Sequence, residues 1–152
     1  MLKKLFILIV IGSSSSILSA SLINDMQGCQ AVLKFVDMKL ADAPKSYAPE
    51  DVKLVRKGLK TYDTYIQKEI VTPGLLQFNG GDKAKARTMQ DQVDTYKSQL
   101  VAGFEKRYPQ AGLKTDHAIS VNECAKKAVP EGADLEALKK AVETMVKLAQ
   151  TK

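Results

Sequence analysis

The sequence holds little of what most catalytic and metal sites are built from. It has one histidine, His117, and two cysteines, Cys29 and Cys124, among 152 residues. A zinc site needs three or four thiolate, imidazole or carboxylate ligands, and these residues cannot supply them once the cysteines form a bridge. The chain also lacks a Cys-x-x-Cys-His run, a Gly-x-Ser-x-Gly nucleophile turn and a Walker or dinucleotide glycine pattern. We therefore expect neither a catalytic nor a metal site.

Long apolar runs are missing too. The longest, Leu5–Ile11, is too short to span a membrane, which takes about 20 apolar residues. It follows a pair of lysines and precedes four serines and a few small residues, which is the layout of a secretory signal peptide. We expect residues 1–20 to be a leader cleaved near Ala20, and residues 21–152 to be one domain. The product would be periplasmic or secreted, with no stable membrane anchor.

The net charge is too small for a nucleic-acid-binding protein. The formal charge is +6 for the whole chain and falls to +4 when the two leader lysines are removed. Binding to a phosphate backbone depends on many lysines and arginines, and an exported protein is in the wrong compartment for it. We therefore expect no nucleic-acid partner.

Cys29 and Cys124 are expected to form a disulfide. Two cysteines in an exported chain of this size are most simply paired with each other. The bridge would close a long loop, which is worth about 4 to 5 kcal/mol in the chain-entropy treatment of disulfides.

Apolar residues recur every three or four positions in five stretches, which is the period of amphipathic helices. No stretch alternates convincingly with period two, so a sheet is not expected. Short links favour antiparallel neighbours. We expect an all-α fold, an antiparallel up-and-down helical bundle of four to five helices stapled by one disulfide. The apolar stripes cover residues 22–40, 52–70, 86–104, 121–128 and 135–149. Tyr62 and Tyr96 lie on two of these stripes, so we expect both side chains in the core.

The motif Thr72-Pro73-Gly74 is expected to end the second helix. Residues 74–81 would then form the longest loop, and this loop contains three large apolar side chains. One interpretation is a loop packed over one end of the bundle; the other is a docking loop for a partner. The candidate contact residues in it are Leu75, Leu76 and Phe78.

Basic residues gather on one face of the second predicted helix. Lys53, Arg56, Lys57 and Lys60 share that face, because residues three or four apart are neighbours on a helix. Such a cluster can bind an acidic lipid headgroup, a polyanion or an acidic partner. The alternative is an ordinary solvated face.

His117 offers one cofactor alternative. An antiparallel pairing around the disulfide would place it near Met38, and a histidine with Met38 or Met26 could ligate non-covalent haem. The chain is similar to exported b-type cytochrome bundles in its leader, helical hairpins, single histidine and early methionine. It departs from them because their histidine lies near the end of the chain. The other interpretation is a partly exposed histidine in a first helical turn.

These observations favour a small exported helical protein that acts as a non-catalytic binding or interaction module without a cofactor. Its partner would be a protein, a peptide or a small apolar or anionic ligand in the envelope. The chain itself would be a monomer or a homodimer. A haem-binding bundle that uses His117 is the alternative.

Overall fold

The structure is a computed structural model that describes residues 15–151, so most of the predicted leader lies outside the described part. Every element in the described part is helical, and the predicted all-helical fold with one disulfide is confirmed. No helix among these residues is both long and apolar enough to cross a membrane. The elements are α1 (Ser15–Ala41), α2 (Pro49–Tyr65), the π-helical turn η1 (Ile66–Val71), α3 (Thr72–Phe78), α4 (Lys83–Arg107), α5 (Thr115–Lys127) and α6 (Gly132–Gln150).

Local sequence explains where α2 and α4 begin. Pro49 opens α2, where its fixed φ suits the first turn and its missing N–H would have had no partner. Asp82 caps α4, and its Oδ1 accepts hydrogen bonds from the backbone N–H groups of Ala84 and Lys85, both at 3.0 Å. Asp134 lies in the first turn of α6, where a negative charge suits the positive end of the helix dipole.

The prediction that Thr72-Pro73-Gly74 ends the second helix is wrong. α2 passes without a break into η1, and α3 follows directly. Proline has no N–H, and its ring clashes with the carbonyl four residues earlier in a regular α-helix. In the wider turn of η1 the Thr72 N–H bonds to Gln67 O, and Pro73 then lies in the first turn of α3. Residues 74–81, predicted as a loop, are therefore mostly helical.

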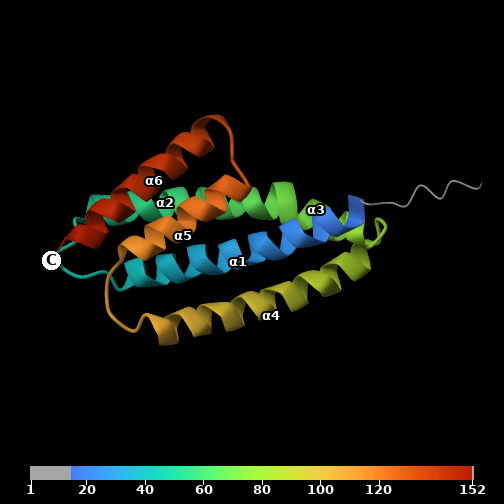
Figure 1. Cartoon of the computed structure of the whole chain (residues 1–152), viewed down its shortest axis with the longest axis horizontal. Coiled ribbons are helices and arrows are strands. Elements are labelled where there is room, and N and C mark those ends of the chain that lie inside the picture. Colours follow the sequence, from blue (N-terminus) through green and yellow to red (C-terminus); the bar gives the residue numbers. More distant parts are fainter. Residues whose placement is uncertain (1–14, 152) are drawn as a thin grey trace, which may run out of the picture.

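α1 is the central helix. It contacts α2, α3, α4 and α5, whereas α6 packs on α2 and α5. Figure 1 shows α4 along one side of α1, with α2, α5 and α6 on the other side. Among the described elements α4 packs closely against α1 and α3, and η1 reaches it through a side-chain hydrogen bond. The molecule thus has a thick side and a thin side around α1.

Most of the buried side chains lie on the thick side. Cys29 of α1 and Cys124 of α5 form the predicted disulfide there, with a Cα–Cα distance of 5.6 Å. Tyr62 of α2 is buried as predicted, and its hydroxyl donates a hydrogen bond to Ala128 O at 2.9 Å. The other large side chains that are fully buried in the core are Met26, Leu40, Leu59, Ile66, Leu138, Met145, Leu148, Val36, Val55, Val71 and Val121.

The stripe predicted on α4 is only partly buried. Val93 of the stripe is buried, but Tyr96 is 49% exposed, and the other buried residue of α4, Val101, lies beside the predicted stripe. Leu22, at the start of the stripe predicted on α1, is also 38% exposed. The period identifies which face of a helix is apolar, but the number of neighbouring helices decides how much of that face is covered.

Candidate partner-binding surface

The four basic residues predicted as a contact surface line one groove between α1 and α2. The groove has a volume of about 700 Å³, and Leu33, Val52 and Leu59 give it apolar walls. We call it the basic groove. Its lining residues are Leu33, Lys34, Asp37, Pro49, Val52, Lys53, Arg56, Lys57, Leu59, Lys60 and Asp63.

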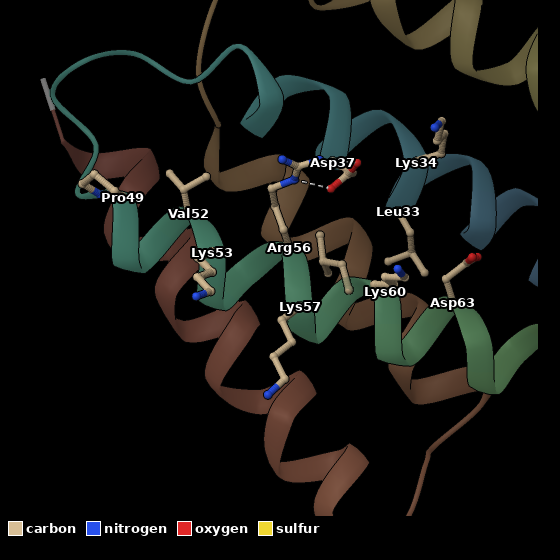
Figure 2. Close-up of a pocket in the computed structure, with 11 residues that line it drawn as sticks. Leu33, Lys34, Asp37, Pro49, Val52, Lys53, Arg56, Lys57, Lys60 and Asp63 are labelled. Carbon is tan, nitrogen blue, oxygen red and sulfur yellow. Dashed lines mark hydrogen bonds and ion pairs between the residues drawn. The ribbon is translucent and has the colours of Figure 1, made fainter.

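Arg56 is held across the basic groove by Asp37 of α1 (Figure 2). Its Nε donates to Asp37 Oδ1 at 2.7 Å and its Nη2 donates to Asp37 Oδ2 at 3.2 Å, so the pair is bidentate. The hydrogen bond, and then the charge of Asp37, raise the pKa of Arg56. Sequence reasoning missed this pair because no local pattern joins residues on different helices. Asp37 therefore compensates the positive charge of Arg56, which is less available to a partner than the sequence suggests.

The three lysines of the cluster have no such partner. In the part of the chain that the structure describes, no carboxylate oxygen lies within 4.0 Å of the ammonium of Lys53, Lys57 or Lys60. All three residues are exposed. Figure 2 shows Lys57 extending away from α1, whereas Arg56 turns toward it. The lysine charges therefore spread over the surface of α2 and do not converge on one point.

A second groove adjoins the basic groove. It has a volume of about 440 Å³, and Lys57 and Lys60 line both grooves. Lys68 adds a cation to the second groove, while Glu69 and Asp134 add acids. The two lysines shared by the grooves therefore lie in a surface of mixed charge.

Asp63 is a half-buried acid in the lining of the basic groove. Burial raises the pKa of its carboxyl group, and a hydrogen bond with Gln30 and the charges of Lys97 and Lys34 oppose this rise. When its carboxyl group is ionised, Asp63 adds a negative charge to the lining of the basic groove.

The predicted apolar contact residues lie apart from the basic groove. Leu75 is buried and Leu76 is half-buried, so only Phe78, 55% exposed, presents a large apolar surface. Leu75 and Phe78 line a separate groove of about 510 Å³ with Tyr96 of α4. The two grooves share no lining residue, so the structure does not combine the two predicted surfaces. Tyr96 was assigned to the core from its spacing and was therefore missed as an exposed residue.

His117, the ligand in the haem alternative, is enclosed by aromatic rings. It is 4% exposed, so the prediction of a partly exposed histidine is wrong. The ring centroids of Phe35 and Tyr108 lie 5.3 and 4.9 Å from that of the imidazole, both edge-on. Met38 is half-buried beside a groove of about 230 Å³ that His117 does not line, and Met26 is fully buried. A porphyrin would have to displace both rings, so this arrangement does not favour the haem alternative.

The described residues do not form a recognisable metal site. Within residues 15–151 no group of three or more histidine, cysteine, aspartate or glutamate side chains is placed to hold a metal ion.

Comparison with known proteins gives no family for the chain. No protein-family model matches it, and neither a curated protein nor a solved structure is significantly similar to it. The function must therefore be inferred from the geometry of the chain itself.

Proposed function

We propose that this chain is an exported, non-catalytic binding protein whose basic groove contacts an acidic protein or peptide. The observation that carries the proposal is the position of Lys53, Lys57 and Lys60. They are exposed, lack a carboxylate partner in the described chain and lie beside apolar groove walls. Their charge is available to a partner, whereas that of Arg56 is already used by Asp37. We take the helices to form an antiparallel up-and-down bundle that holds these residues on a rigid support.

Export is supported by the disulfide. The Cys29–Cys124 bridge belongs to an oxidising compartment, because cytosolic thiols are kept reduced. Removal of a leader near Ala20 would release the domain into the periplasm or the medium. There the basic groove would meet the surfaces of other envelope or secreted proteins.

An acidic protein surface suits the basic groove better than a small anion does. A small anion needs several donors that converge on one point, and the lysine side chains diverge (Figure 2). A membrane of anionic lipids is also a poorer match, since Asp63, Glu69 and Asp134 would face it and be repelled. A folded or peptide partner can place acids opposite the lysines and place neutral or basic groups opposite these carboxylates.

The direct test uses poly-L-glutamate as an acidic probe. We expect the folded wild-type domain to bind it at low ionic strength, with an affinity that falls as salt is added. The triple variant Lys53→Glu, Lys57→Glu, Lys60→Glu should bind at least about tenfold more weakly, since three attractive contacts become repulsive. Isothermal titration calorimetry measures both affinities.

A matched control separates the groove from the overall charge. Lys83, Lys106 and Lys140 are exposed on α4 and α6 and lack a carboxylate within 4.0 Å in the described chain. Their reversal to glutamate changes the net charge by the same amount and should leave most of the binding intact. Equal loss in the two triple variants would show that only net charge matters and would overturn the proposed site. Tighter binding to anionic vesicles than to poly-L-glutamate would instead favour a membrane surface.

A further inference from the structure

His117 occupies an unusual position for the only histidine of the chain. It lies in the first turn of α5 and is 4% exposed. Its ring forms T-shaped pairs with those of Phe35 of α1 and Tyr108, which follows α4. One imidazole therefore joins three parts of the molecule: α1, the end of α4 and the start of α5.

The hydrogen bonds of His117 define its protonation state. Its Nδ1 accepts a hydrogen bond from the backbone N–H of Lys114 at 3.1 Å, which caps α5. Nδ1 must then be unprotonated, so the proton of the neutral ring is on Nε2. Nε2 is buried and has no hydrogen-bond partner among the described residues. Protonation would place an N–H of the ring against the N–H of Lys114 and would destroy the cap.

The surroundings of the ring also oppose a positive charge. Burial is the main reason that the pKa of His117 lies below its ordinary value. Lys39 on α1 and Lys114 next to α5 lower it further, and Asp116 is the one nearby acid that raises it. Tyr108 also faces the imidazole, and the two ring centroids lie 4.9 Å apart.

Other contacts also hold the connection between α4 and α5 to α1 and its neighbouring loop, since Leu113 is buried in the core and Gly112 lies against Tyr47. Lys39 Nζ donates to Gln110 O at 2.9 Å, and the Leu113 N–H donates to Tyr47 Oη at 2.8 Å. About two helical turns after His117, Cys124 is bonded to Cys29 of α1. A movement that starts in the first turn of α5 would therefore be limited by the disulfide, which holds the later part of the helix to α1.

We propose that His117 is an acid-operated latch. When the ring is neutral, it caps α5 and packs the connection 108–114 against Phe35. When it is protonated, the cap is lost and the charged ring leaves its aromatic site. The connection and the first turn of α5 then separate from α1, and the rings of Phe35 and Tyr108 become accessible. The disulfide confines this opening to one end of the molecule.

Amide hydrogen exchange by NMR tests the latch. The single histidine gives one set of imidazole signals, which should titrate with a midpoint below about 6.5. The exchange rate of the Lys114 amide, corrected for the intrinsic effect of pH, should rise at least about tenfold between pH 7.5 and pH 5. Amides in the middle of α6 should change much less over this range.

Two variants separate titration from packing. His117→Gln keeps an acceptor at the helix position where capping boxes carry glutamine, but it cannot titrate. Its Lys114 amide should stay protected at pH 5. His117→Phe keeps the ring but removes the acceptor, so this amide should exchange fast at both pH values. Wild-type protection that persists at pH 5 after the ring has titrated would overturn the latch, as would an equal pH response in His117→Gln.

Discussion

The helices on the thick side and the thin side of α1 are held in place by different kinds of interaction. On the thick side α2 and α6 approach so closely that a Cβ atom at Gly58 would lie 2.6 Å from Ala141 Cβ. On the thin side, polar contacts supplement a narrow apolar stripe. Gln67 of η1 donates to Gln90 of α4 at 2.9 Å, and Lys97 of α4 donates to Gln30 of α1 at 3.3 Å.

The difference predicts where the structure opens first. Buried apolar area provides most of the free energy that holds helices together, and part-exposed hydrogen bonds add about 1 kcal/mol each. We expect α4 to open locally at a lower free energy than α6. The basic groove is formed by α1 and α2, so it would remain intact while α4 moves.

The largest expected effect comes from the disulfide on the thick side. The double variant Cys29→Ser, Cys124→Ser should lower the free energy of unfolding by about 4 to 5 kcal/mol in the chain-entropy treatment. Urea denaturation with and without the bridge measures this. Loss of the bridge should also reduce the difference in amide protection between α6 and α4. An unchanged unfolding midpoint would show that the thick side is held by packing alone.

Replacing one methionine with alanine on each side of α1 tests how tightly the two sides are packed. Met145 of α6 is fully buried, and Met89 of α4 is partly buried. Met145→Ala should cost about 2 to 5 kcal/mol of unfolding free energy. Met89→Ala should cost at most about 1 kcal/mol because less contact is lost. Equal losses in urea denaturation would contradict the proposed contrast between the two sides.

The substitution of glycine by alanine should change the stability of the protein in opposite directions at two positions. At Gly58 a new Cβ would lie 2.8 Å from the backbone oxygen of Ala137, whereas at Gly103 of α4 nothing lies within 4 Å. Gly58→Ala should destabilise the protein by about 1 to 3 kcal/mol through overpacking. Gly103→Ala should stabilise it by about 0.5 to 1 kcal/mol through helix propensity. Thermal unfolding followed by circular dichroism would show one melting temperature falling and the other rising.

The smallest expected effect is the pH dependence of stability caused by His117, which lies where the two sides meet. The pKa of His117 is lowered in the folded state, so the unfolded chain binds more protons near its ordinary pKa of about 6.5. The neutral ring of His117 contributes this stability fully above about pH 6.5, and the contribution is lost as the pH falls below that value. Wild-type stability should therefore decline more between pH 7 and pH 5 than that of His117→Gln, as measured by urea denaturation at each pH.

Local patterns in the sequence were sufficient for the helices and the bridge. The apolar period depends only on spacing within a segment, so it located the five helical stretches and placed Tyr62 in the core. The disulfide was predicted from the number of cysteines and from the predicted leader. The cluster Lys53, Arg56, Lys57 and Lys60 shares one helical face, and the structure places all four residues in one groove.

The parts that were not predicted depend on contacts between distant segments. The local stop signal at Thr72-Pro73-Gly74 predicted a helix end, but the π-helical turn η1 allows the helix to continue into α3. Tyr96 is exposed because, among the described elements, only α1 and α3 pack closely against α4. The bond between Arg56 and Asp37 and the burial of His117 arise only when separate helices come together.

The most direct test of the central claim is to map the bound acidic probe on the wild-type domain. Amide chemical shifts measured by NMR during a poly-L-glutamate titration report which residues meet it. We expect the largest shifts at Lys53, Lys57 and Lys60 and at the facing residues of α1, with little change around Phe78 and Tyr96. Shifts spread evenly over all exposed lysines, or centred on Phe78 and Tyr96, would contradict the assignment of the basic groove as the contact surface.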